Sequence, residues 1–326
     1  MLRLLGLGLL ASAFFSSTYV LNEQMSAQGG HWFWSASLRY LFVLLLLSVM
    51  LLVQGGPALL RGLWQEFRRH APFWVLAGSL GFGAFYALLC FSSAYASAWV
   101  VAATFQFTVV ASLIVLAAFG QPFSRGVIFS ALLVFAGVCL TNLGQPHGAS
   151  GQTLGESLLY GALPALLAAF CYPAGNQLVW QAARPGPAAG TPGARSWAAR
   201  VPYIRTPLLK NTFGRIWLMT LGSMPLWGVL GLLHPVLPQG GQVVRVSTAL
   251  VALLSGVIAT GLFLYARDEA RTPGEIATVD ATQASEVIFA LLGGVLLLGS
   301  PLPGPLAWAG LVTILVGLVL FTRAGR

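Results

Sequence analysis

The chain has 326 residues, of which 57% are hydrophobic and only 8% are charged. A soluble protein carries about 25% charged residues, so this composition excludes a soluble domain and predicts a polytopic membrane protein. The net charge of +9 is then first an orientation signal, and we do not expect nucleic-acid binding.

Ten apolar runs of about 20 residues are long enough to cross a bilayer as helices. In chain order they are Leu2–Leu21, Trp32–Leu52, Phe73–Phe91, Ala98–Phe119, Gly126–Leu143, Ser157–Trp180, Thr212–Leu233, Thr248–Tyr265, Ile276–Leu298 and Pro305–Phe321. The first run continues through Val20 without a break, so we interpret it as a membrane span and not as a cleaved signal peptide. The sequence therefore predicts an all-α protein with ten transmembrane helices.

The basic residues alternate along the gaps between these runs. Fifteen of the seventeen Lys and Arg residues fall at the chain ends, in every second gap or just inside a run beside one, and the exceptions are Arg39 and Arg245. Under the positive-inside rule, this pattern places both chain ends and the long basic loop in the cytoplasm.

The two halves of the chain look related. Residues 1–150 hold the first five runs, residues 151–181 and 212–326 hold the other five, and the basic Pro/Gly-rich segment 182–211 links the sixth run to the seventh. A shift of about 178 to 180 residues superposes Ala103-Thr104 on Ala281-Thr282 and Gly137 on Gly317. Because five is odd, the second copy enters the membrane from the opposite side, which is the inverted repeat of secondary transporters.

The ninth run carries the residues of most chemical interest. Asp280, Gln283 and Glu286 recur every three residues, so they share one face of the predicted helix. A carboxylate at the middle of a span costs on the order of a few kcal/mol and rarely faces lipid. We therefore expect Glu286 to face a cavity and to couple proton movement to transport. The alternative is a structural carboxylate with a buried partner.

Other polar and aromatic residues of the runs are candidates for the wall of the same cavity. With Asp280 and Gln283, the candidates are Trp34, Arg39, Tyr40, Thr104, Gln106 and Asn176. Arg39 lies about eight residues into its run, where snorkelling to the interface is the alternative. Asn176 follows Pro173 and Gly175, which we expect to interrupt the sixth helix and to line a cavity there.

Signatures of enzymes, cofactors and metal sites are missing from the sequence. Lys210 is the only lysine and follows no glycine-rich loop, so we expect no ATP site. Three isolated cysteines in apolar runs favour neither a disulfide nor zinc, and the four histidines form no HExxH pair. We expect no cofactor, no metal and no catalysis. A membrane-embedded lipid-modifying enzyme is the remote alternative, since Asp268 and Glu269 lack a His companion.

Five segments carry a resemblance to a known family: STYVLNEQM, GGHWFWSASLRY, AWVVAATFQFTVV, YPAGNQLVW and ATVDATQASEVIFALLGG. On these segments the chain resembles the drug/metabolite transporter superfamily, its EamA-like ten-helix branch, and within it the multidrug resistance efflux transporters. The resemblance implies a bacterial inner-membrane secondary transporter whose cavity is built mainly from the first four helices of each half. Members often have Gly-Glu late in the ninth helix, where this chain has Gly293-Gly294.

The same resemblance implies that the fifth and tenth helices serve as packing helices or form a homodimer. Small residues recur along both of them, at Ser130 and Gly137 and at Gly310, Thr313 and Gly317. Such stripes are typical of close helix contact.

The leading hypothesis is an exporter of small organic molecules that works by alternating access and is driven by protons or by substrate exchange. The alternative keeps the fold but makes the cargo an amino acid or other metabolite, with Glu286 structural and the protein an exporter or a uniporter. Arg39 beside the neutral Gln106, Asn176 and Gln283 would suit a zwitterion.

Overall fold

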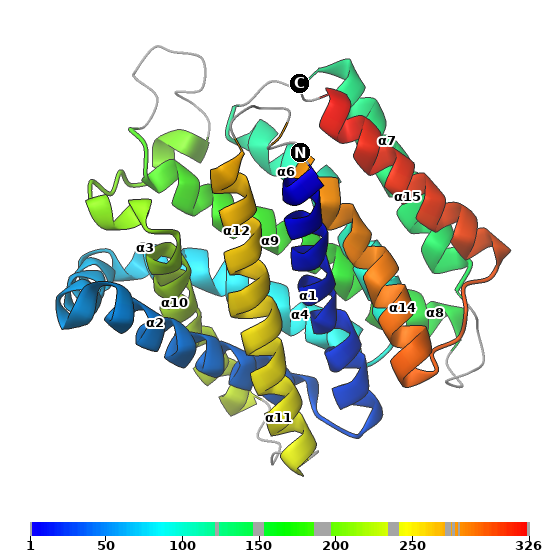
Figure 1. The fold of residues 1–326 in the computed structure, drawn as a ribbon, viewed down its shortest axis with the longest axis horizontal. Coiled ribbons are helices and arrows are strands. Elements are labelled where there is room, and N and C mark those ends of the chain that lie inside the picture. Colours follow the sequence, from blue (N-terminus) through cyan, green and yellow to red (C-terminus); the bar gives the residue numbers. More distant parts are fainter. Residues whose placement is uncertain are drawn as a thin grey trace.

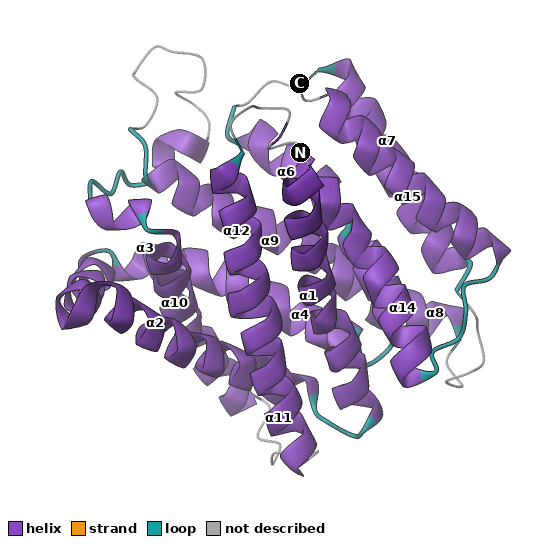
Figure 2. Cartoon of the chain, in the orientation of Figure 1, coloured by secondary structure: helices purple, strands orange, loops and turns teal. Residues whose placement is uncertain are grey.

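The structure is a computed structural model that describes residues 2–120, 124–145, 153–185, 197–233, 241–270, 275, 278–279 and 281–324. All regular secondary structure in these residues is helical (Figure 2). Within them, nine helices are long and apolar enough to cross a membrane, and a shorter apolar helix covers Thr282–Leu298. Together these make the ten predicted spans of a polytopic all-α membrane protein.

The first half of the chain supplies five spans, several of which are built from more than one helical segment. The segments are α1 (Leu2–Ala27); α2 (Trp32–Arg69); α3 (Ala71–Gly78), the π-helical turn η1 (Ser79–Ala84) and α4 (Phe85–Ser92); α5 (Ala98–Phe105) and α6 (Thr108–Ala118); and α7 (Arg125–Leu143). The third and fourth spans are therefore the composite ones.

The second half follows the same plan. Its spans are α8 (Leu154–Glu156), the π-helical η2 (Ser157–Ala162) and α9 (Leu163–Ala182); α10 (Thr212–Leu233); α11 (Gly241–Val251), the π-helical η5 (Ala252–Ala259) and α12 (Thr260–Glu269); the 3-10 turn η6 (Thr282–Ser285) and α14 (Glu286–Leu298); and α15 (Pro305–Ala324). Between α9 and α10 lie two short 3-10 turns, η3 (Trp197–Arg200) and η4 (Pro207–Lys210). The domain boundaries near residues 150, 181 and 211 stay predictions.

The second helix is longer than the predicted span Trp32–Leu52. It continues to Arg69 across a break at Gly56, whose φ of 65° is left-handed and suits glycine, and Pro57 follows the break. After the break, Leu63 packs among buried residues that include Ile204 and Leu209 of the loop between α9 and α10. The basic gap after the second run is therefore a packed helix.

The packing of the ten spans repeats itself when each span is exchanged for the one five places further on. The contact between the third and sixth spans is repeated by the contact between the eighth and first. The contact between the fourth and sixth is repeated by the ninth and first, and that between the third and seventh is repeated by the eighth and second. The pairs second–seventh, fourth–ninth and fifth–tenth map onto themselves. This pattern is what two related five-helix repeats produce, and Figure 1 shows both described chain ends at the same end of the bundle.

The repetition fails at one end of the bundle. The first span packs against the fourth and the second against the third. Among the described residues, no comparable packing joins the sixth span to the ninth or the seventh to the eighth. These four spans separate at the end that holds both described chain ends, the ends of α9 and α12 and the start of α10. We call it the basic end, because most arginines lie there, and the other the opposite end.

The fifth and tenth spans, α7 and α15, form a pair at the side of the bundle (Figure 1). A Cβ on Gly137 would lie 2.7 Å from the backbone nitrogen of Ile314, and one on Gly317 would lie 3.0 Å from that of Val134. The small-residue stripes therefore contact each other within one chain, because only glycine allows the two backbones to come so close. A homodimer through these helices stays a prediction, and it would use their other faces.

Candidate functional site

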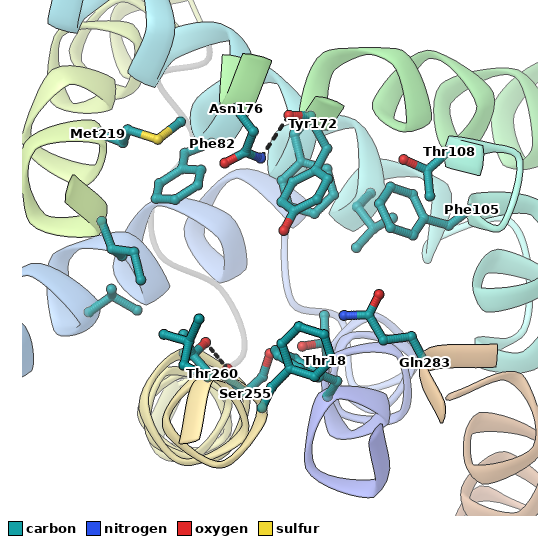
Figure 3. A pocket seen from close by; sticks show the side chains of 18 of the residues that line it. Thr18, Phe82, Phe105, Thr108, Tyr172, Asn176, Met219, Ser255, Thr260 and Gln283 are labelled. Atoms are coloured by element: carbon teal, nitrogen blue, oxygen red, sulfur yellow. Dashed lines mark hydrogen bonds between the residues drawn. The ribbon is translucent and has the colours of Figure 1, made fainter. Parts of the chain in front are cut away.

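A cavity of about 470 Å³ lies between the separated spans and reaches the middle of the bundle. Its lining comes from the first four spans of each half, as the resemblance implies, and no described residue of α7 or α15 contributes to it. The lining residues are Phe15, Thr18, Tyr19, Arg39, Tyr40, Val43, Phe82, Phe85, Leu89, Phe105, Gln106, Thr108, Tyr172, Asn176, Val179, Trp180, Thr212, Arg215, Ile216, Met219, Ser255, Gly256, Thr260, Phe263, Leu264, Arg267, Gln283 and Glu286. Figure 3 shows labelled side chains from seven of these spans around one open space.

The cavity opens at the basic end. Trp180, near the end of α9, keeps 37% of its surface exposed, and Arg267, near the end of α12, is exposed as well. Deeper in the bundle the lining residues are largely covered, and Tyr40 keeps only 5% of its surface exposed. The cavity is therefore a blind pocket that is entered from one side.

Hydrogen bonds close the opposite end. Glu23, near the end of α1, accepts one from the backbone N–H of Ala98 and one from the hydroxyl of Ser300, both at 2.7 Å. Close by, the indole N–H of Trp99 donates to the carbonyl of Pro301 at 3.3 Å. We call these contacts the seal. They hold the first span, the start of the fourth and the α14–α15 loop together.

Glu286 is the first residue of α14, directly after the 3-10 turn η6. A 3-10 turn stacks residues three apart, so Gln283 and Glu286 keep the shared face that the sequence predicts, although η6 is not α-helical. Both line the cavity, and Figure 3 shows Gln283 pointing into it. Asp280, the third member of the predicted set, lies outside the described residues.

Glu286 lines the cavity and is partly exposed as a residue, and its carboxyl group makes no hydrogen bond or ion pair with a described residue. Tyr19 of α1 and Tyr172 of α9 are near enough to interact with it electrostatically. The described residues thus hold no charge partner for Glu286, which the structural alternative requires.

Arg39 of α2 points into the bundle and lines the cavity. Its Nη2 donates to the hydroxyl of Ser255 at 3.1 Å, and its guanidinium carbon lies 4.0 Å from the centre of the Tyr86 ring. The Nε atom is buried without a hydrogen-bond partner. The snorkelling alternative does not describe this geometry, because the charged group is held by side chains of the third and eighth spans.

Three neutral candidates also line the cavity. Tyr40 packs against the rings of Phe82 and Trp227, with centroids 5.8 and 5.7 Å away. Gln106 lies in the turn that separates α5 from α6, so the fourth span breaks where the ninth changes from 3-10 to α-helix. Asn176 donates to the carbonyl of Tyr172 at 2.9 Å, and Figure 3 shows its amide oxygen free of that bond.

Two candidates do not line the cavity. Trp34 packs against Phe33 with ring centroids 5.1 Å apart, on the core side of the helix start. Thr104 is fully buried and accepts a hydrogen bond from Asn142 of α7 at 2.8 Å. Thr104 faces a neighbouring helix, and Trp34 packs against the hydrophobic core.

The expected interruption of the sixth helix is also wrong. Helix α9 runs unbroken from Leu163 to Ala182 through Pro173 and Gly175. Gly175 instead allows a close crossing with Gly81 of the third span, where a Cβ on Gly81 would lie 2.9 Å from the Cα of Gly175. This crossing fixes the part of α9 that carries Tyr172 and Asn176.

Sequence reasoning missed most of the aromatic lining and two of the arginines. Tyr19, Phe85 and Phe105 lie in apolar runs. In such a run the sequence does not distinguish an aromatic residue that faces the cavity from one that faces lipid or the core. Arg215 was counted with the basic loop, although its position just inside the seventh run places it at the cavity mouth. Arg215 lies close to the first residue of the seventh run, Thr212, and this position was the signal in the sequence that it belongs to the helix and not to the loop.

A pocket lined by eight spans of two related halves, open at one end and sealed at the other, belongs to a membrane transporter for small molecules. A family model described as "EmrE: Putative multidrug resistance efflux transporter" matches residues 2–326, and the chain belongs to this family. Membership supports transport of small molecules and points away from enzymatic activity.

Two relatives and one solved structure are similar to the chain along most of its length. "Uncharacterized protein YjlA" of Bacillus subtilis (strain 168) is 34% identical over 98% of this chain and 94% of the relative. The "Uncharacterized 42.1 kDa protein in intracellular alkaline protease 3'region" of Shouchella clausii is 33% identical over 86% and 69%. A solved structure described as "Crystal structure of protein" shares 14% identity and a TM-score of 0.56 over 97% of this chain and 96% of that one, and this likeness concerns the fold alone.

Proposed function

We propose that the protein exports small organic molecules across the bacterial inner membrane by alternating access, with the basic end in the cytoplasm. The observation that carries the proposal is the uneven packing of the two repeats. Contacts between the first and fourth spans and between the second and third close one end, while the described residues of the second half show no comparable packing between the counterpart spans. Exchanging the two arrangements would close the cytoplasmic entrance and open the opposite end.

Glu286 is the residue through which we propose that transport is coupled to protons. It lines the cavity from the middle of a span and has no charge partner among the described residues. A carboxyl group in that position meets water from one side in each state, so it can take up a proton on one side and release it on the other. The matching break in the fourth span, at Gln106, places a neutral amide at the equivalent point.

Transport by the purified protein in proteoliposomes tests the coupling. A panel of aromatic cations, anions, zwitterions and neutral compounds is loaded, and efflux is followed with and without an imposed pH gradient. We expect efflux of the responding compound to depend on the gradient in the parent protein and to lose that dependence in Glu286→Gln.

The matched control is Glu269→Gln, which removes a carboxylate outside the cavity that pairs with Arg3 at 3.6 Å on the exposed surface. It should behave like the parent, because surface pairs contribute little to stability. Gradient-dependent efflux that survives in Glu286→Gln would refute the coupling role and leave a uniporter or exchanger of the same fold, with Glu286 structural.

A further inference from the structure

Arg39 brings a positive charge into the interior of the bundle, where it lines the cavity. Its described partners are the hydroxyl groups of Ser255 and Tyr86 and the rings of Tyr40 and Tyr86, and it makes no ion pair with a described carboxylate. The hydroxyl of Tyr86 donates to Asn22 at 3.1 Å and can still accept from Arg39, so what Arg39 lacks is a negative counter-charge. A buried guanidinium is stable when its N–H groups meet an anion, so an arginine that lines the cavity without an ion pair to a described residue marks a place for one.

The charges around the cavity favour the same sign of ligand. Its described charged lining consists of Arg39, Arg215, Arg267 and a single carboxylate, Glu286. Arg215 donates to Thr212 at 3.1 Å and has a buried Nε without a partner. An aromatic cation entering from the basic end would be repelled at the mouth and again at Arg39, whereas an anion would be attracted at both places.

The remaining walls are apolar and largely aromatic. Phe85 lies between Phe105 and Tyr172, with ring centroids 5.3 and 5.1 Å away, so the three rings form one face of the cavity. A volume of about 470 Å³ falls in the range of pockets that take a small drug-sized ligand. Such a pocket selects a flat, apolar body that carries one charged group.

We propose that the transported molecules are amphiphilic organic anions, whose carboxylate or similar group binds Arg39 while an aromatic body packs against Phe85, Phe105 and Tyr172. The proposal rests on the transporter function and names its substrate class. It makes Arg39 the residue that determines specificity for charge. Arg215, near the entrance, would guide the anion inward without holding it.

The proposal also fixes the sign of proton exchange on binding. Arg39 and Glu286 line the same cavity, and Tyr19 and Tyr172 line it with them. The fourth span adds only the neutral Gln106. A bound anion therefore favours protonation of Glu286, so by linkage anion and proton bind and move together, and export is then driven by the anion's own gradient and not by an inward proton gradient. A cationic substrate would instead compete with the proton.

Four compounds of nearly equal shape test the charge preference on the purified full-length protein: phenylacetate, phenylacetamide, phenethylammonium and phenylalanine. Binding is measured by titration calorimetry in detergent, and proton exchange is followed with a pH indicator in weak buffer. We expect phenylacetate to bind best and to cause proton uptake that disappears in Glu286→Gln. Arg39→Gln should weaken its binding at least about tenfold, and Arg39→Lys should weaken it less.

Arg61→Gln is the matched control, because Arg61 is an exposed arginine on the cytoplasmic part of α2. It should leave binding unchanged. If Arg39→Gln does not fold, the ranking of the four compounds and the proton uptake of the parent protein still decide the question.

Three results would overturn the proposal. Preference for phenethylammonium with proton release would make the protein a cation transporter, and binding of phenylalanine alone would make it a zwitterion transporter. Binding of none of the four compounds would remove Arg39 as a site for such anions. Loss of gradient-driven efflux with anion binding intact would instead refute the coupling through Glu286 and leave the substrate class standing.

Discussion

The crossing of Gly175 and Gly81 provides a sharp test of how the cavity wall is held. In Gly175→Ala, the new Cβ would meet the Cα and the backbone nitrogen of Gly81 and would lie 2.8 Å from the carbonyl oxygen of Ala77. All three are backbone atoms, so no side-chain rotation relieves the overlap. The sixth and third spans must move apart.

The size of the effect follows from two opposing contributions. Overpacking of a tight contact costs about 1–3 kcal/mol, and a clash with backbone belongs at the upper end of that range. Replacing glycine by alanine within a helix returns up to about 1 kcal/mol. The net loss is about 2 kcal/mol. At about 2–4 °C per kcal/mol for a chain of a few hundred residues, the unfolding temperature should fall by roughly 4–8 °C.

The assay is thermal unfolding of the purified protein in detergent, followed by tryptophan fluorescence, together with efflux from proteoliposomes. Transport should fall too, because Tyr172 and Asn176 move with α9. Gly228→Ala is the matched control: Gly228 lies inside α10, and a Cβ there would meet no atom within 4 Å. Equal unfolding temperatures and equal efflux in the two variants would refute the tight crossing.

Three further predictions concern the seal, a buried hydrogen bond and the break in α2. Glu23→Gln should weaken the seal. A membrane-impermeant thiol reagent added from the opposite side should then label a cysteine placed in the cavity faster than it does in the parent, and an unchanged labelling rate would count against the seal. Asn142→Leu removes the hydrogen bond to Thr104 from a buried site and should lower the unfolding temperature by a few degrees while efflux persists, because neither residue lines the cavity. Gly56→Ala should destabilise the protein by about 1–2 kcal/mol because φ is positive there, whereas Gly6→Ala, with open space around it, should not; equal unfolding temperatures would contradict the strained turn.

The spans were predictable because length and hydropathy alone decide whether a segment can cross a bilayer. Arg39 and Glu286 could be recognised in the sequence by their charge, because an ionised side chain in an apolar run rarely faces lipid. Both line the cavity. Their roles stay proposals.

Other parts of the site were beyond sequence reasoning for physical reasons. A membrane helix is apolar on every side, so no periodicity tells a cavity-facing Phe85 from a lipid-facing residue. For the same reason the sequence did not show that Thr104 meets Asn142 of α7 or that Trp34 packs against the hydrophobic core. Pro173 did not break α9, since a proline inside a membrane helix is tolerated where the surroundings satisfy the freed backbone groups.

The π-helical turns in the third and eighth spans change the phase of those helices. A π turn contains an extra residue, and each residue turns an α-helix by about 100°. Before η5 the eighth span packs against the second, and after it Phe263 and Arg267 face the cavity. Deleting one residue within η5 would rotate both side chains away from the cavity while leaving the apolar composition of the span unchanged. The extra residue of the π-helical turn therefore sets which side chains of the span face the cavity and which pack against the neighbouring span. A hydropathy profile does not show this residue.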